Sequence, residues 1–199
     1  MEKYVITINR QFGSLGRPIA KEMAEMLKIE YYDRDIVDKT AQEMKLPVSV
    51  VSDNEESAKN RFFSMKFPMG TGTNIVQDRL FDAQQKIILN LADKNSCIIV
   101  GRCSDYILRN EKRHISIYIY APYEQRLKNC IETLGMDERT ARKMINEVDR
   151  ARDSYHIHYA KYFPNDLEHV NVMLDSSLLG ITGSASSLVE IVKHKFGLI

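Results

Sequence analysis

The sequence predicts a single α/β domain in which a five-stranded parallel sheet is covered by helices on both faces. Short, apolar, β-branched stretches alternate with helix-like stretches along all 199 residues, which is typical of a parallel sheet buried on both sides. Hydrophobic residues make up 44% of the chain and charged residues 28%, as in average soluble globular proteins. A chain of this size buries enough surface to fold without a metal or disulfide. We therefore expect one domain over residues 1–199.

The elements follow from local patterns. Pro18 suits a first helical turn, where its missing N–H is not needed, and Asp33 and Asp137 are placed to cap the helices that follow them. Polar residues 49–73 break the alternation but contain three phenylalanines, and we interpret this segment as a lid or an interface. The expected strands cover residues 4–8, 29–32, 97–100, 115–120 and 170–174, and the expected helices cover residues 18–27, 34–44, 74–92, 104–108, 122–134, 137–162 and 184–196.

Charge and cysteine content exclude several classes of protein. The 28 Lys and Arg residues against 27 Asp and Glu leave a net charge of +1, which argues against a general nucleic-acid binder. No apolar run reaches the roughly 18 residues of a membrane span, and the N-terminus lacks a signal peptide pattern. The three cysteines, without a CxxC pair or metal-ligand spacing, are expected to be reduced thiols. We expect a cytoplasmic protein with neither nucleic-acid nor membrane partners.

Three groups of residues follow predicted strands or lie on a late helix, and each is able to bind an anion. Glycines and a helix start suit the first group to a phosphate cradle, although it is otherwise a tight turn with a surface arginine. In the second group, Asp105 is either a ligand contact or a helix cap. The third is by default a solvated helix face with an i,i+3 ion pair. The groups comprise Arg10, Gly13, Ser14, Leu15, Gly16, Arg17 and Pro18; then Gly101, Arg102 and Asp105; then Arg139, Arg142, Lys143, Asp149, Arg150 and Arg152.

Taken together and in order, these motifs resemble the cytidylate kinase-like family. The resemblance rests on residues 6–21, 100–108, 121–126 and 149–152, and on Tyr32-Asp33. It implies a P-loop nucleoside-monophosphate kinase fold with an acceptor-binding region near residues 33–75 and a lid near 125–163. It also implies ATP and Mg²⁺ as cofactors, small nucleotides as partners and CMP as the first acceptor to consider.

The resemblance assigns roles to individual residues. Residues 10 and 13–18 would bind the nucleotide, Asp33, Lys39, Arg102 and Asp105 the acceptor, and Arg17, Arg150 and Arg152 would act in catalysis. The P-loop pattern GxxxxGK[ST] is nevertheless absent, because Leu15-Gly16-Arg17 stands where Gly-Lys-Ser is usual. Arg17 is one candidate for the lysine role, and Ser14 or Asp33 is a candidate for reaching the metal through water. The sequence does not assign the metal ligands.

The altered loop leaves three functions open. The first is a kinase that transfers the γ-phosphoryl group of ATP to a nucleoside monophosphate. The second is a nucleotide-binding regulatory protein that has lost transfer. The third is an interaction module, compatible with a homodimer, that uses the aromatic segment 62–69.

Other residues invite a functional reading that the pattern does not favour. His156 and His158 are expected to be surface or partly packed histidines, because two positions apart on a helix they make a poor metal pair. Tyr155, Tyr159 and Tyr162 are spaced as a stripe that packs one helix on another. Cys103 follows Arg102 at a predicted helix start, which would lower the pKa of its thiol.

Overall fold

The computed structural model describes residues 2–33, 36, 39–40, 42–43, 45 and 74–198. Five parallel strands form one sheet in the order β2-β3-β1-β4-β5, which confirms the predicted fold class. Most of the expected helix at 34–44 and all of the lid or interface at 49–73 lie outside the described residues. The strands are β1 (Val5–Arg10), β2 (Glu30–Tyr32), β3 (Cys97–Val100), β4 (His114–Tyr120) and β5 (Val172–Asp175).

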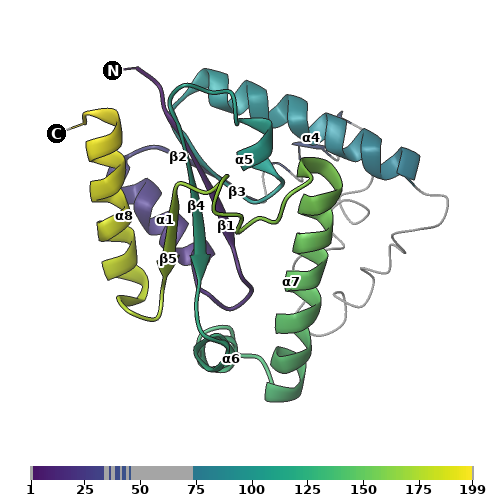
Figure 1. The fold of residues 1–199 in the computed structure, drawn as a ribbon, viewed down its shortest axis with the longest axis vertical. Coiled ribbons are helices and arrows are strands. Elements are labelled where there is room, and N and C mark those ends of the chain that lie inside the picture. Colours follow the sequence, from purple (N-terminus) through teal and green to yellow (C-terminus); the bar gives the residue numbers. More distant parts are fainter. Residues whose placement is uncertain are drawn as a thin grey trace.

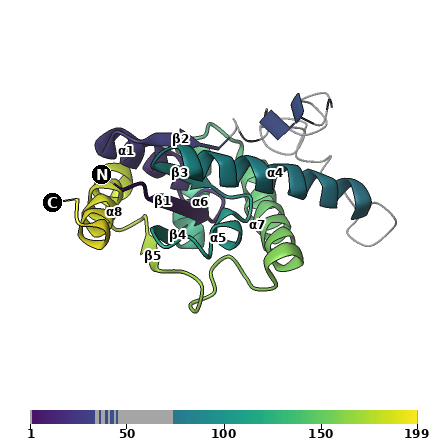
Figure 2. The ribbon, with the colours of Figure 1, turned by 90° about the horizontal axis from the view of Figure 1, so that it is seen from above.

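Helices lie on both faces of the sheet (Figures 1 and 2). Helices α1 and α8 cover one face, while α4, α5 and the C-terminal half of α7 cover the other. Helix α6 lies near the carboxyl ends of β1 and β4, below the sheet in Figure 1. The helices are α1 (Gly16–Leu27), α4 (Asn74–Lys94), α5 (Ser104–Ile107), α6 (Tyr123–Glu132), α7 (Glu138–Ala160) and α8 (Gly180–Phe196).

The central strands are buried because both of their faces are covered. Ile6, Ile8 and Ile98 are fully buried between the sheet and α1 and α8, and Ile99 is fully buried on the opposite face, beneath α4 and α5. β-Branched side chains suit this pleated environment. The core therefore fixes the position of the loops that leave the strand ends.

The helix boundaries follow most of the sequence signals. The Asp137 carboxylate accepts the N–H of Thr140 at 3.0 Å at the start of α7, as its predicted capping role requires. Helix α8 begins at Gly180, four residues before the predicted start at Ser184. Glycines at 180 and 183 weaken a helical pattern, so the sequence does not indicate this first turn.

The tyrosine stripe packs α7 on α4, as its spacing predicts. The Tyr159 ring stacks on Phe81 with centroids 3.9 Å apart, and the Tyr155 hydroxyl donates to Gln84 at 3.1 Å. Tyr162 follows the helix and lies edge-on to Tyr106 of the segment around α5. Among the described residues, no helix combines the length and apolar character that crossing a membrane requires.

Candidate active site

The loops that follow β1 and β3 meet at the carboxyl edge of the sheet. The two strands are neighbours, with Ile8 opposite Val100, and the Gly101 N–H donates to the Ile8 carbonyl at 3.0 Å. In open parallel sheets, ligands bind at this edge. The first two predicted groups, residues 10–18 and 101–105, are therefore brought together.

The β1–α1 loop (residues 11–15) has a conformation that depends on Gly13. This residue has φ +78°, and a Cβ added to it would lie 2.7 Å from the Arg126 carbonyl oxygen and 2.9 Å from Cys130 Sγ. Only glycine tolerates both the dihedral angle and the contact. Leu15, at φ 59°, precedes α1 and provides no side-chain cap, so the first N–H groups of α1 are left to other acceptors, such as an anion.

Ser14 anchors this loop to the sheet. Its side chain is fully buried, and its hydroxyl lies 2.9 Å from the Gln11 carbonyl oxygen and 3.1 Å from that of Ile119, to which it donates. The Ser14 carbonyl in turn accepts the Ser176 hydroxyl at 2.7 Å. The Ser14 hydroxyl thus gives its proton to main-chain oxygens, and a contact of Ser14 with metal-bound water stays a prediction.

Helices α6 and α7 clamp the same loop. Asp149 accepts the Phe12 N–H at 2.7 Å through one carboxylate oxygen and pairs with Arg126 at 2.5 Å through the other. Asn129 donates to the Gly13 carbonyl at 2.8 Å, and Arg152 of α7 donates to the carbonyl of Arg10 at 3.0 Å. The Asp149–Arg152 pair expected from sequence is present but long, at 3.9 Å. Residues from the predicted lid thus touch the β1–α1 loop directly.

Arg17 is turned toward the end of β2. Its Nε donates to Asp33 at 2.5 Å, and the Tyr31 hydroxyl donates to the same carboxylate oxygen at 3.2 Å. Burial, together with the negative charge of Asp33, raises the pKa of Tyr31 to about 12. Asp33 is 2% exposed, and its other oxygen, Oδ1, has no hydrogen-bond partner among the described residues. Its predicted capping role concerns residues outside the described part of the chain.

The other cationic residues of the predicted site differ in their exposure and in their neighbours. Arg102 is half-buried with φ 62° directly after Gly101, and Lys39 lies 5.2 Å from the centroid of the Tyr32 ring. Arg150 is exposed on α7, and so is Pro18 in the first turn of α1. The geometry thus places Arg10, Arg17, Arg102 and Arg152 around the two loops.

Asp105 is hydrogen-bonded to side chains that the sequence did not connect with it. Its carboxylate is buried, and its oxygens lie 3.1 and 2.9 Å from His156 Nε2 and 3.3 Å from the Tyr162 hydroxyl. Both oxygens are therefore occupied by groups from α7 and the segment after it. Sequence reasoning missed this pairing, and a substrate contact for Asp105 stays a prediction.

The partner of Asp105 also differs from expectation. His156 is only 3% exposed, so the prediction of a surface or partly packed residue is wrong. Burial by itself would lower the pKa of His156, but the hydrogen bond and charge of Asp105 raise it. Likewise, burial would raise the pKa of Asp105, but the hydrogen bond and charge of His156 lower it. The two side chains form a buried ion pair that joins α5 to α7.

The cysteines are buried, and the described residues hold no multi-ligand metal cluster. Cys103 is 1% exposed, and burial raises the pKa of its thiol, so the expected lowering is wrong. All three cysteines are buried and free of disulfides. The parts of the chain that the structure describes contain no cluster of three metal-ligating side chains.

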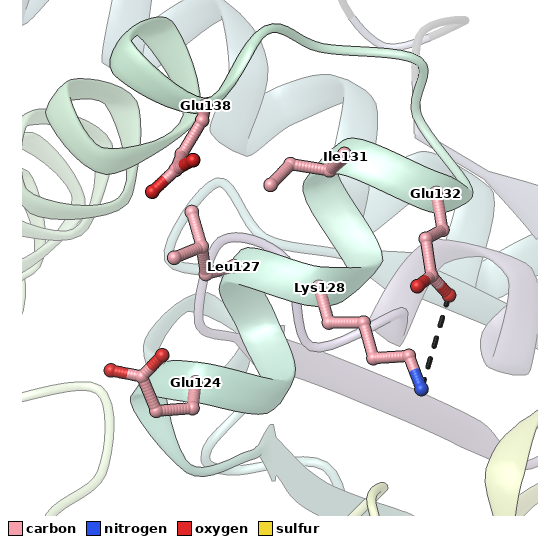
Figure 3. A pocket seen from close by; sticks show the side chains of 6 residues that line it. All are labelled: Glu124, Leu127, Lys128, Ile131, Glu132 and Glu138. Atoms are coloured by element: carbon pink, nitrogen blue, oxygen red, sulfur yellow. Dashed lines mark ion pairs between the residues drawn. The ribbon is translucent and has the colours of Figure 1, made fainter.

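A surface hollow between α6 and the start of α7 lies apart from this chemistry (Figure 3). Three of its six lining residues are glutamates, and its lysine, Lys128, lies 4.0 Å from Glu132. This acidic lining would repel a phosphate group. The lining residues are Glu124, Leu127, Lys128, Ile131, Glu132 and Glu138.

The sheet order, the β1–α1 loop and the flanking helices define the P-loop kinase fold. Residues 5–178 match the model of the cytidylate kinase-like family, and the chain belongs to that family. No curated protein sequence matches the chain.

Several solved structures share the fold over nearly the full chain. An uncharacterized protein from Eubacterium ventriosum ATCC 27560 is 24% identical, with a TM-score of 0.70 over 97% of this chain and 98% of the other. The shikimate kinase from Acinetobacter baumannii, in complex with shikimate, is 13% identical, with a TM-score of 0.52 over 98% and 94% of the chains. A gluconokinase from Sinorhizobium meliloti 1021 is 9% identical, with a TM-score of 0.50 over 98% and 91%.

Proposed function

We propose that this protein is a kinase that transfers the γ-phosphoryl group of ATP to a nucleoside monophosphate, with CMP as the first acceptor to test. One observation carries the proposal: four arginines from four separate parts of the chain lie in or beside the loops that follow β1 and β3. Arg10 ends β1, Arg17 lies in α1, Arg102 follows β3 and Arg152 extends from α7. Phosphoryl transfer depends on positioning and on neutralising charge over the transferring group.

Each element has a distinct role in this proposal. The backbone of residues 13–17 binds the donor phosphates, and Arg10 and Arg17 contribute charge. Arg102 and Lys39 bind the acceptor phosphate, because both lie toward the β2–β3 side of the site. Arg152, with Arg150 beside it on α7, closes over the γ-phosphoryl group as part of a lid spanning residues 125–163.

Asp33 is the described residue that fits a magnesium ion best. Its Oδ1 is buried without a hydrogen-bond partner in the described part of the chain, and Mg²⁺ is usually held by one or two carboxylates together with water and phosphate oxygens. Bound Mg²⁺ would neutralise charge on the β- and γ-phosphates. The Arg17 guanidinium, 2.5 Å from the other Asp33 oxygen, would keep that carboxylate oriented.

A regulatory protein that binds nucleotide without transfer is the second candidate. Specific features favour it: Arg17 stands at the position of the P-loop Ser or Thr and is already paired with Asp33, and the Ser14 hydroxyl donates to main-chain oxygens. A site of this kind would retain affinity for ATP while lacking groups that stabilise the transition state.

Coupled measurement of ADP release separates the two candidates. Purified protein with MgATP is assayed against each nucleoside monophosphate, with shikimate and gluconate as acceptors taken from the structurally similar kinases. ADP release that depends on a nucleoside monophosphate supports the kinase. Calorimetric binding of MgATP without turnover on any acceptor supports the regulatory protein, and absence of binding rejects both.

A further inference from the structure

Arg10 and Gly16 lie so close that only one of these positions has room for a side chain. A Cβ added to Gly16 would lie 2.7 Å from the Cβ of Arg10 and 3.0 Å from its Cγ. Real Cβ atoms do not approach this closely, and the clash involves the rigid base of the Arg10 side chain. Glycine at position 16 is therefore required by the arginine at position 10.

The same two positions are linked in the P-loop pattern. GxxxxGK[ST] places its first glycine six residues before its lysine, and Arg10 precedes Gly16 by the same interval. In register with that pattern, this chain has arginine in place of the glycine and glycine in place of the lysine. One close contact explains both departures, because a cation at either position requires glycine at the other.

The Arg10 side chain extends from β1 to the loop after β3. Its Nη1 contacts the position that a Cβ on Gly101 would occupy, and Gly101 itself has φ +74°. Arg10 Nε is buried and has no hydrogen-bond partner in the described part of the chain. Within those residues, no carboxylate forms an ion pair with Arg10. Packing between two glycines therefore orients the guanidinium while its charge stays available to an anion.

We propose that Arg10 supplies, from the end of β1, the phosphate-bridging cation that P-loop proteins supply from the lysine at the start of the helix. This inference rests on the proposed function, since it concerns the same phosphates. It assigns the lysine role to Arg10 in place of Arg17, whose Nε is paired with Asp33. The planar guanidinium offers forked donors that suit two phosphate oxygens at once.

Four variants test whether Arg10 takes the place of the P-loop lysine. Arg10→Met keeps the stem of the side chain and removes the charge, and Arg10→Gly removes the side chain. Gly16→Lys forces a clash with Arg10, and the double variant Arg10→Gly/Gly16→Lys restores glycine and lysine to their usual positions in the pattern. Lys112→Ala, in the exposed turn before β4, is the charge-matched control. Circular dichroism and thermal melting establish that each variant is folded.

Calorimetric titration with MgATP, pyrophosphate and AMP provides the readout. We expect Arg10→Met and Arg10→Gly to weaken MgATP and pyrophosphate binding by about ten- to a hundredfold, the loss of a charge-assisted bond. AMP binding should change little, because the bridging cation contacts the β- and γ-phosphates. The double variant should recover most of the lost affinity, and Lys112→Ala should resemble the wild type.

Two outcomes overturn the proposal in distinguishable ways. If the wild type binds MgATP and Arg10→Met binds it equally well, Arg10 is not the bridging cation, although the proposed function stands. An equal loss for AMP and MgATP likewise indicates a structural role and contradicts the proposal. If the folded wild type binds neither MgATP nor pyrophosphate, the proposed function fails, and the role of Arg10 fails with it.

Discussion

Asp149 of α7 accepts the backbone N–H of Phe12 at 2.7 Å, so a residue more than a hundred positions away holds the loop that follows β1. The same carboxylate pairs with Arg126 of α6, whose side chain is 10% exposed. Helices α6 and α7 and the β1–α1 loop therefore form one hydrogen-bonded unit. Any movement of α7 would be transmitted to the backbone of the β1–α1 loop.

Asp149→Ala is expected to destabilise the protein by about 1–3 kcal/mol, because it leaves the largely buried Arg126 guanidinium and the Phe12 N–H without their acceptor. Urea unfolding measures the change. Glu147→Ala, which removes an exposed partner of Lys143, should cost less than about 0.5 kcal/mol. Equal effects of the two substitutions would contradict a clamping role for Asp149.

Gly13→Ala is expected to be more damaging than Gly135→Ala. Both glycines have positive φ, +78° and +65°, but an added Cβ meets the Arg126 carbonyl at Gly13 and nothing within 4 Å at Gly135. Backbone strain of about 1–2 kcal/mol applies to both, and only Gly13→Ala adds the clash. Thermal melting should show a clearly larger loss for Gly13→Ala, and equal losses would mean that α6 does not closely approach the loop.

The Asp105–His156 pair predicts a pH-dependent stability. Folding raises the pKa of His156 above 6.5, so this contribution is complete below pH 6.5 and is lost as the pH rises through the raised folded value. Folding lowers the pKa of Asp105 below 3.8, so its contribution is present above pH 3.8 and is lost as the pH falls through the folded value. The pair is therefore most stabilising between pH 3.8 and pH 6.5.

Unfolding free energies of the wild type and His156→Gln, measured from about pH 5 to pH 9, test this window. The wild type should be more stable at the acidic end, and its advantage should shrink as the pH rises. His158→Gln, on the exposed side of the same helix, should retain the wild-type slope. An advantage that grows with pH would show that His156 is buried as the neutral imidazole.

Asp33→Asn should raise the Mg²⁺ concentration required for half-maximal ADP release, because it removes the charge of the buried carboxylate beside Arg17. A titration of Mg²⁺ at fixed ATP measures this requirement. Asp93→Asn, at a largely exposed carboxylate near Lys3, is the control. An unchanged Mg²⁺ requirement in Asp33→Asn would exclude Asp33 from the metal site.

The sequence predicted those features that depend on local pattern. The strand over residues 97–100, the Asp137 cap and the packing of Tyr155 and Tyr159 all follow from periodicity or capping chemistry that is visible in a short window. The five-stranded parallel sheet follows from the alternation of such windows. Such elements can be predicted because apolar residues repeat along the sequence at the spacing of a helix or a strand.

The contacts that define the site are not local. Asp149 with Phe12, Asn129 with Gly13 and Asp105 with His156 join residues 51 to 137 positions apart, and no window contains both members. Arg10 and Gly16 are only six positions apart, so one sequence window contains both. The close approach of their Cβ positions, however, is visible only in the folded backbone. The burial of His156 is likewise not visible in its own helix, because it depends on Asp105, which lies on another element.

Amide NMR during a titration with MgATP tests the central claim most directly, namely that the loop after β1 binds the phosphates of ATP. We predict that the N–H signals of Gly13, Leu15, Gly16 and Arg17 shift together with saturable dependence on MgATP, while those lining the acidic hollow of α6 stay unchanged. Unshifted loop signals, or shifts confined to α6, would contradict the account.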